Sequence, residues 1–316
     1  MKQYYYFYAG LEIVSDLPIP EWDVFEYSKP SNNIDVFISL ENSLNEESKI
    51  EENLPFISSN NYRFYIPSIG TYRVENGRKI TVAPVSGANP QAVRLYLLGS
   101  AMGALYYQRG FLSIYASVLQ IGNTSVAFCG TVGAGKSTMV AHLTRKGYNL
   151  VCDDLCRLDL SKKDQISVWP AAPSFKLWQD TIDSLGWDNK TMERDHVRYD
   201  KFHVPLGDEH PLKYPMEPIP LSAIYILDWG EWSIKRLYAQ DALTRFITAA
   251  TYRHELIEPM NILGSYWGNC LKVATHVPIF ELNRSRNLLI MNQNIDLLKA
   301  HWAENKILDT KEVITA

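Results

Sequence analysis

The chain has 316 residues, of which 46% are hydrophobic and 21% charged, as in a globular protein of one large or two moderate domains. Its formal net charge of −4 at pH 7 gives no basic field of the kind that binds nucleic acid or an anionic membrane surface, so we expect neither partner. No apolar run approaches the roughly eighteen residues of a membrane span, and the first residues lack a signal-peptide pattern, so we expect a cytoplasmic protein.

Residues 1–88 are predicted to form a β-rich N-terminal domain. Asn76 and Gly77 stand between two strand-like runs, and Asn-Gly favours the type I′ turn of a hairpin because both central residues need a positive φ. The other predicted strands are assigned from alternating apolar residues. In this part of the chain the expected strands cover residues 34–40, 61–66, 70–75 and 78–83.

A long connecting helix is predicted over residues 89–109. Asn89 is a suitable N-cap, and Pro90 follows it at the first helical position. Gly99 and Gly103 would allow another element to pack closely against the helix. A second, catalytic domain is expected to cover residues 110–316.

A phosphate-binding loop is the strongest motif in the chain. Between Gly130 and Ser137 every fixed position of G-x-x-x-x-G-K-[ST] is satisfied, after a strand-like run and before a helical one. The backbone N–H groups of such a loop surround phosphate oxygens, the lysine adds a cation, and the hydroxyl of the last residue binds Mg²⁺. The nucleotide-binding residues are predicted to be Gly130, Thr131, Val132, Gly133, Ala134, Gly135, Lys136, Ser137 and Thr138.

Two adjacent carboxylates carry the second signal. Asp153 and Asp154 follow a predicted strand at residues 148–152, one helix and one strand beyond the loop. Because open α/β sheets bind ligands beyond the carboxyl ends of their strands, we expect this pair beside the loop. One carboxylate would bind metal and the other would act as general base. A solvated Asp-Asp turn is the simpler alternative.

The remaining chain is predicted to contain further strands and helices and a cationic segment at residues 190–201. Arg194, Arg198 and Lys201 of this segment could reach a γ-phosphate or an acidic substrate, although charged loops are usually only solvated. The predicted strands lie at residues 221–227 and 278–282, and the predicted helices at 181–187, 241–252, 257–273 and 292–302.

The four cysteines are predicted to be buried free thiols. Cys152 and Cys156 have no second ligand pair to complete a zinc site, and most of the cysteines lie in apolar runs.

The segment from residue 119 to Asp154 resembles the catalytic core of the HPr serine kinase/phosphorylase family, both in the loop and in its Asp153-Asp154 ending. The β-rich N-terminal part, the Trp169-Pro-x-x-Pro and Lys176-Leu-Trp stretches and residues 278–282 are similar to HPr-kinase homologues encoded beside lasso-peptide precursors. Those homologues phosphorylate the precursor peptide on a serine hydroxyl. The weaker likeness spans residues 110–300.

The resemblance implies an α/β fold with a P-loop kinase core of the HPr kinase/phosphoenolpyruvate carboxykinase type. It implies ATP and Mg²⁺ as cofactors, Asp153 as general base, Asp154 as a metal ligand together with Ser137, and Lys136 as a catalytic cation. The partner would be a peptide or small protein that bears a serine, and a homo-oligomer is compatible with the likeness.

The chain also departs from this family. Tyr115 stands where the family has a histidine, and the Glu-Arg-Gly-Leu-Gly-like segment of true HPr kinases is absent, which favours a peptide over HPr. Tyr115 is nevertheless expected to face the nucleotide. Two alternatives stay open: a regulatory module that senses ATP without transferring phosphate, and a kinase for a small molecule. A pure sensor would not need Asp153 as a base.

Overall fold

The computed structural model describes residues 2–27, 33–41, 55–188, 192–196, 199–206 and 216–307. The chain divides into two compact units, which we describe separately. Unit 1 comprises Met1–Ser113 and Tyr252–Gly268, and unit 2 comprises Ile114–Thr251 and Asn269–Ala316.

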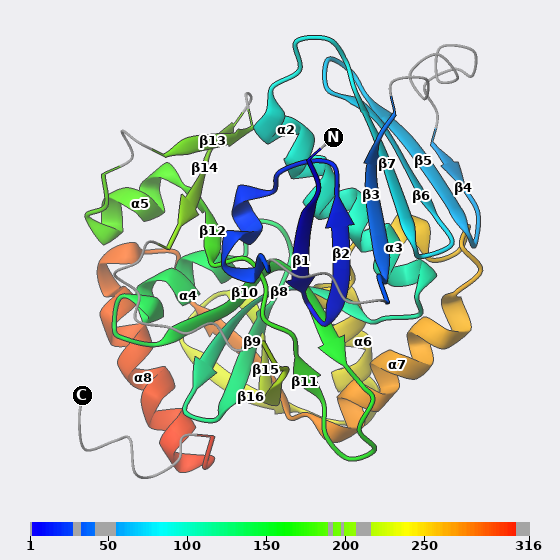
Figure 1. Cartoon of the computed structure of the whole chain (residues 1–316). Coiled ribbons are helices and arrows are strands. Elements are labelled where there is room, and N and C mark those ends of the chain that lie inside the picture. Colours follow the sequence, from blue (N-terminus) through cyan, green and yellow to red (C-terminus); the bar gives the residue numbers. More distant parts are fainter. Residues whose placement is uncertain are drawn as a thin grey trace. The chain divides into compact units, whose positions relative to one another are not determined.

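Unit 1 is built on a seven-stranded sheet of order β1-β2-β3-β7-β6-β5-β4 (Figure 1). The β2–β3 and β3–β7 pairs are parallel and the other pairs are antiparallel. Asn76 and Gly77 have φ values of 53° and 61°, so the predicted hairpin turn between β6 and β7 is confirmed. The strands are β1 (Tyr4–Tyr8), β2 (Leu11–Ser15), β3 (Val36–Leu40), β4 (Phe56–Ile57), β5 (Asn61–Ile66), β6 (Gly70–Glu75) and β7 (Lys79–Pro84).

The predicted long helix is present but is interrupted by a π-helical turn. The side chain of Asn89 caps it by accepting a hydrogen bond from the Gln91 N–H. A Cβ atom at Gly103 would lie 2.8 Å from the Tyr252 ring, so this glycine permits the close packing that the sequence suggested. The helical segments of unit 1 are η1 (Pro20–Phe25), α2 (Pro90–Tyr96), η2 (Leu97–Ala101), α3 (Met102–Gln108) and η3 (His254–Leu256).

Unit 2 contains a second seven-stranded sheet of order β11-β10-β8-β9-β15-β17-β16. Strand β15 is parallel to both β9 and β17, while β8 and β16 run antiparallel to their partners β9 and β17. Strand β11 also pairs with the start of β15. The strands are β8 (Ser113–Ile121), β9 (Thr124–Cys129), β10 (Asn149–Asp159), β11 (Ser167–Val168), β15 (Ile219–Trp229), β16 (Ser233–Leu237) and β17 (Ile279–Arg284).

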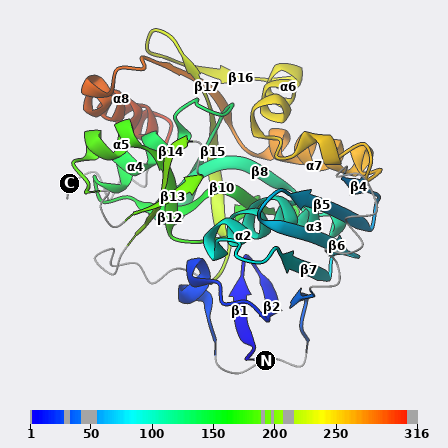
Figure 2. The same cartoon turned by 90° about the horizontal axis from the view of Figure 1, so that it is seen from above.

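Helices cover this sheet because alternate strand residues are apolar on each face. Tyr225 and Leu227 of β15 belong to the core cluster that contains residues of α4 and α8, which lie together at one side of the sheet in Figure 2. Ile224 and Ile226 alternate with them and are buried as well. The helical segments are α4 (Lys136–Thr144), α5 (Gln179–Leu185), α6 (Ala239–Ala250), α7 (Leu263–His276, which crosses the unit boundary), η4 (Leu288–Ile290) and α8 (Met291–Glu304).

A small third sheet of order β12-β14-β13 stands beside α4 and α5 in unit 2. Phe175 and Leu177 of β12 are buried in the core, whereas the alternate residues Lys176 and Trp178 are partly exposed. Trp178 lies opposite Lys201 in the antiparallel register with β14. The strands are β12 (Ser174–Trp178), β13 (Glu193–His196) and β14 (Tyr199–Pro205).

The chain is thus mixed α/β with several sheets, and three predicted elements need correction. The helix predicted at residues 257–273 begins only at Leu263, because Asn261 adopts a left-handed φ of 56° shortly after Pro259. The strand predicted to end before Asp153 continues to Asp159. Part of the cationic segment treated as a loop forms β13 and β14.

Two further predictions concern cysteines and membranes. All four cysteines are buried and free, as predicted. Within the part of the chain that the structure describes, no helix is both long and apolar enough to cross a bilayer.

Candidate active site

The phosphate-loop motif joins the end of β9 to the start of α4, so the predicted strand–loop–helix context is confirmed. Gly130, Gly133 and Gly135 have φ values of 149°, 82° and 79°, which side-chain-bearing residues rarely adopt. At Gly135 a Cβ atom would clash with a guanidinium nitrogen of Arg284. The N–H groups of the first helical turn have no acceptor within the helix, so the loop and the helix dipole together favour an anion.

Lys136 lies inside the curve of the loop with only 5% of its surface exposed. Its Nζ donates hydrogen bonds to the carbonyl oxygens of Gly130 at 3.0 Å and Thr131 at 3.2 Å. The same Nζ lies 3.6 Å from the ring centroid of Tyr115. Burial lowers the pKa of Lys136 to about 8, although Asp153 acts in the opposite direction. A buried, poorly hydrated cation beside a phosphate loop is stabilised when it binds an anion.

Asp153 reaches the loop directly. Its Oδ1 accepts hydrogen bonds from Ser137 Oγ at 2.9 Å and from Ser117 Oγ. Its Oδ2 accepts one from the Lys176 N–H at 3.1 Å. Burial raises the pKa of Asp153, while the Ser117, Lys176 and Ser137 hydrogen bonds act against it. Asp153 is therefore a partly buried carboxylate with an increased tendency to hold a proton.

Asp154 has a different environment from its neighbour. Lys176 Nζ donates a hydrogen bond to Asp154 Oδ2 at 2.7 Å. Burial alone would raise the pKa of Asp154, but the charges of Lys176, Lys201 and Lys136 outweigh it and lower that pKa. Adjacent carboxylates with opposite pKa shifts are suited to different chemical tasks.

The Asp pair lies within strand β10 and not beyond its end, which corrects the sequence-based placement. Asp154 has a left-handed φ of 79°, so the regular alternation of side chains is interrupted there. As a result both carboxylates contact Lys176 of β12, one through its backbone and the other through its side chain.

Lys176 was not predicted as a site residue, although it is part of the Lys176-Leu-Trp stretch that supported the resemblance. Its alternation with buried Phe175 and Leu177 places it on the partly exposed face of β12. The pairing of β12 with Asp153 is a long-range contact that sequence spacing does not reveal. One lysine thus fixes both carboxylates.

Arg284, at the end of β17, was also not predicted. It is 1% exposed, and its Nη2 donates to the carbonyl oxygens of Ala134 at 3.1 Å and Gly135 at 2.9 Å. Its guanidinium lies 4.4 Å from the Trp229 ring centroid, and that of Arg286 lies 5.1 Å from it. Burial lowers the pKa of Arg284 to about 10. Arg284 therefore lies at the edge of the cavity and holds two carbonyls of the loop backbone.

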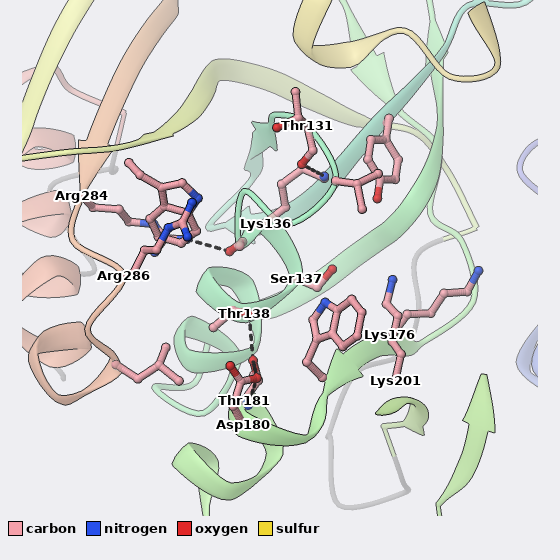
Figure 3. A pocket seen from close by; sticks show the side chains of 17 residues that line it. Thr131, Lys136, Ser137, Thr138, Lys176, Asp180, Thr181, Lys201, Arg284 and Arg286 are labelled. Atoms are coloured by element: carbon pink, nitrogen blue, oxygen red, sulfur yellow. Dashed lines mark hydrogen bonds between the residues drawn. The ribbon is translucent and has the colours of Figure 1, made fainter. Parts of the chain in front are cut away.

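A cavity of about 520 Å³ opens in front of the loop (Figure 3). This is within the size range of small-molecule sites. It is lined by seven of the nine predicted nucleotide-binding residues, while Gly130 and Ala134 contribute carbonyls to Lys136 and Arg284. Tyr115 lines it too, which confirms the prediction that this side chain faces the loop site. Neither Asp153 nor Asp154 is among the lining residues, and both lie behind Ser137 and Lys176.

The cationic segment contributes one of its three predicted residues to the cavity. Lys201 lines it together with Lys176 and Trp178. Arg198 and the side chain of Arg194 lie outside the described residues.

The donors near the loop fit Mg²⁺ bound with a nucleotide. No group of three or more His, Cys, Asp or Glu residues with metal-binding geometry occurs among the described residues. Ser137 and the Asp pair offer hydroxyl and carboxylate oxygens, and Mg²⁺ commonly takes one or two such ligands and completes its shell with phosphate oxygens and water.

Comparisons with known proteins give likenesses among solved structures. No protein-family model matches the chain, and no curated protein matches it. Among solved structures, the chain is similar to the HPr(Ser) kinase/phosphatase from Coxiella burnetii, with 10% sequence identity and a TM-score of 0.33. The alignment covers 62% of this chain and 99% of that chain. The function is therefore argued from the geometry of the site.

Proposed function

We propose that the protein is an ATP-dependent phosphotransferase that transfers the γ-phosphate of ATP to a hydroxyl group. The observation that carries this proposal is the 2.9 Å hydrogen bond between Ser137 of the phosphate loop and Asp153. A loop that only binds nucleotide needs its glycines, lysine and hydroxyl. A carboxylate with a raised pKa directly behind that hydroxyl adds the means to accept a proton.

The loop residues would bind and orient the triphosphate. The N–H groups of residues 131–138 would surround the phosphates, and Lys136 would exchange its loop carbonyls for phosphate oxygens. Mg²⁺, bound through Ser137 and a carboxylate, would neutralise charge on the β- and γ-phosphates. Arg284 keeps the loop in the required shape.

Asp153 is our candidate for the general base. Ser137 already presents a serine hydroxyl to Asp153 Oδ1, and when the Ser137 oxygen turns to the metal, Oδ1 can accept the proton of a substrate hydroxyl. The substrate oxygen then bonds to the γ-phosphorus, the bond from that phosphorus to the β–γ bridging oxygen breaks, and ADP leaves. Asp154, whose pKa is lowered, stays anionic and is suited to the cation.

The type of kinase fold and the phosphate acceptor are proposed from the sequence resemblance. We propose a P-loop core of the HPr kinase/phosphoenolpyruvate carboxykinase type in the part of the chain from residue 110, and the serine of a peptide as phosphate acceptor. A lasso-peptide precursor is the acceptor that the resemblance favours. The cavity supports the nucleotide side of this proposal, since it is lined by Lys136, Ser137 and Thr138.

Two conservative variants test the assignment. Asp153→Asn should lower the rate of phosphate transfer to a serine-bearing peptide by about 10²–10⁴-fold, the usual contribution of a general base, with ATP affinity nearly unchanged. Asp154→Asn should instead raise the Mg²⁺ concentration needed for ATP binding. Transfer is followed with labelled ATP, and binding is measured by calorimetry over a range of Mg²⁺ concentrations.

Asp159→Asn is the matched control, because Asp159 is in the same strand but bonds only to the Ser161 N–H among the described residues. If Asp153→Asn shifts the Mg²⁺ requirement and Asp154→Asn abolishes transfer, the two carboxylates have the opposite roles. If the parent binds ATP but neither variant changes transfer, the site is not a kinase centre and the ATP-sensing alternative is favoured.

A further inference from the structure

The cavity has more positive charge than a nucleotide loop requires. Among its described lining residues Asp180 is the single carboxylate. The lining cations are Lys136, Lys176, Lys201, Arg284 and Arg286.

Three of these cations have a partner near the loop. Lys136 and Arg284 donate to loop carbonyls, and Lys176 pairs with Asp154. No ion pair joins Lys201 or Arg286 to a carboxylate in the part of the chain that the structure describes. Among the described residues, Lys201 and Arg286 are therefore the lining cations held neither by a carboxylate nor by a loop carbonyl.

These two cations lie on different sides of the loop. Arg286 follows the end of β17, and its guanidinium lies over the same Trp229 ring as that of Arg284. Lys201 projects from β14 beside Lys176 of β12, and Figure 3 shows these two lysines on the side of the cavity away from the two arginines. A substrate in the cavity would therefore meet a different cation at each end.

The position of the two carboxylates indicates which end of the cavity receives the acceptor. An acceptor hydroxyl must lie in line with the γ-phosphate and within reach of Asp153 or Asp154. Both carboxylates are hydrogen-bonded by Lys176 of β12, which lines the cavity, so an acceptor within their reach would lie beside β12 and β14.

The register adds an apolar neighbour to Lys201. Trp178 is directly opposite Lys201 in the β12–β14 pair, and opposite residues of an antiparallel pair project from the same face. Trp178 is 38% exposed and lines the same cavity. A cation beside an exposed indole suits a ligand that has an anionic group next to an apolar or backbone surface.

We infer that Lys201 and Trp178 form an acceptor subsite that selects hydroxyl substrates with an anionic group close to the hydroxyl. This inference rests on the proposed kinase function and adds the substrate class. The anionic group is a carboxylate, either an acidic side chain beside the serine or a terminal carboxylate. Lys201 is a specificity residue here, because it would contact the substrate away from the reacting atoms.

Binding of synthetic peptides tests the subsite independently of turnover. The parent protein, loaded with Mg²⁺ and a non-hydrolysable ATP analogue, is titrated by calorimetry with serine peptides that differ only near the serine. One peptide is neutral with a blocked end, one has a glutamate beside the serine, and one has a free terminal carboxylate after the serine. We expect at least one anionic peptide to bind roughly ten-fold or more tightly than the neutral one, since a hydrogen bond to a charged group has about this effect.

Lys201→Gln should remove this preference and leave binding of the neutral peptide unchanged, whereas Lys201→Arg should keep most of it. Trp178→Leu should weaken all three peptides together. Lys235→Gln, on the exposed face of edge strand β16, is the matched control and should bind like the parent. Binding of the ATP analogue checks that every variant is folded.

The outcomes separate the subsite from the kinase function. The proposed acceptor subsite is refuted if the parent binds the three peptides equally. It is also refuted if Lys201→Gln weakens the binding of neutral and anionic peptides alike. If the anionic preference depends on Lys201 but no peptide becomes phosphorylated with ATP, the subsite stands and the kinase proposal fails.

Discussion

Arg284 provides the sharpest test of how the loop keeps its shape. Arg284→Met removes the guanidinium but retains a long apolar side chain beside Ala134 and Gly135. The buried Ala134 carbonyl loses its donor, at a cost of about 1–3 kcal/mol, whereas the Gly135 carbonyl keeps the hydrogen bond from the Met139 N–H. The variant also no longer buries a positive charge. This stabilises it by roughly 3 kcal/mol relative to the parent, because burial lowers the pKa of Arg284 to about 10. The global free energy of unfolding should therefore fall by no more than about 3 kcal/mol.

ATP binding should be affected more than folding. Without Arg284 the Ala134 carbonyl has no donor and is free to turn, so part of the binding free energy of ATP is used to order the loop. We expect the Kd for ATP to rise at least ten-fold, equivalent to about 1.4 kcal/mol. Arg284→Lys should be intermediate, since an ammonium keeps the charge but loses the planar fork. Calorimetric ATP titration and urea unfolding measure the two effects separately.

The control for this experiment is Arg245→Met. Arg245 pairs with Glu281 at 2.6 Å, but its side chain is 41% exposed, so the pair contributes little to stability. ATP affinity should not change in this variant. A folded Arg284→Met protein that binds ATP as tightly as the parent would refute the role of Arg284 in shaping the loop.

Two predictions concern Lys136. ATP affinity should decline as the pH rises through about 8, because Lys136 then loses its proton. The free energy of unfolding of the ATP-free protein should instead rise between about pH 8 and the ordinary lysine pKa, because the unfolded state binds more protons than the folded state in that range. ATP titration and denaturation at pH 6.5–9.5 measure both, and Lys136→Met should lack both trends. Tyr115→Leu removes the ring that favours the charged amine and should move the midpoint down by up to about one pH unit, whereas Tyr115→Phe should not. Equal midpoints in the two Tyr115 variants would contradict the ring contact.

The sequence predicts local structure near the loop well, because that structure depends on local rules. Left-handed glycines, a preceding apolar strand and a following helix are all encoded within a short segment around Lys136. The same holds for the Asn76–Gly77 turn and for the Asn89 cap. Each of these features has a residue whose backbone preference or side-chain hydrogen bond acts on its immediate neighbours.

The sequence does not predict which distant side chains complete the site. Arg284 reaches the loop only because β17 is parallel to β15 and ends level with Trp229. Lys176 reaches the Asp pair because β12 packs beside β10. Both contacts depend on the order and register of strands, and a single apolar pattern is compatible with several such arrangements. Single lysines and arginines on a partly exposed strand face also look like ordinary surface residues.

The Asp153-Asp154 pair shows how strand geometry decides between a site and a solvated turn. In a turn both carboxylates would face water, but here they lie inside β10, and the side chain of Asp154 is only 22% exposed. Asp154 adopts a left-handed backbone conformation, which typically costs about 1–3 kcal/mol and persists where surrounding contacts enforce it. Those contacts are visible: Ser117, Ser137 and the Lys176 N–H hold Asp153, and Lys176 Nζ holds Asp154. These contacts therefore offset the backbone strain and keep two adjacent carboxylates next to the phosphate loop, which is the arrangement that the proposed phosphate transfer requires.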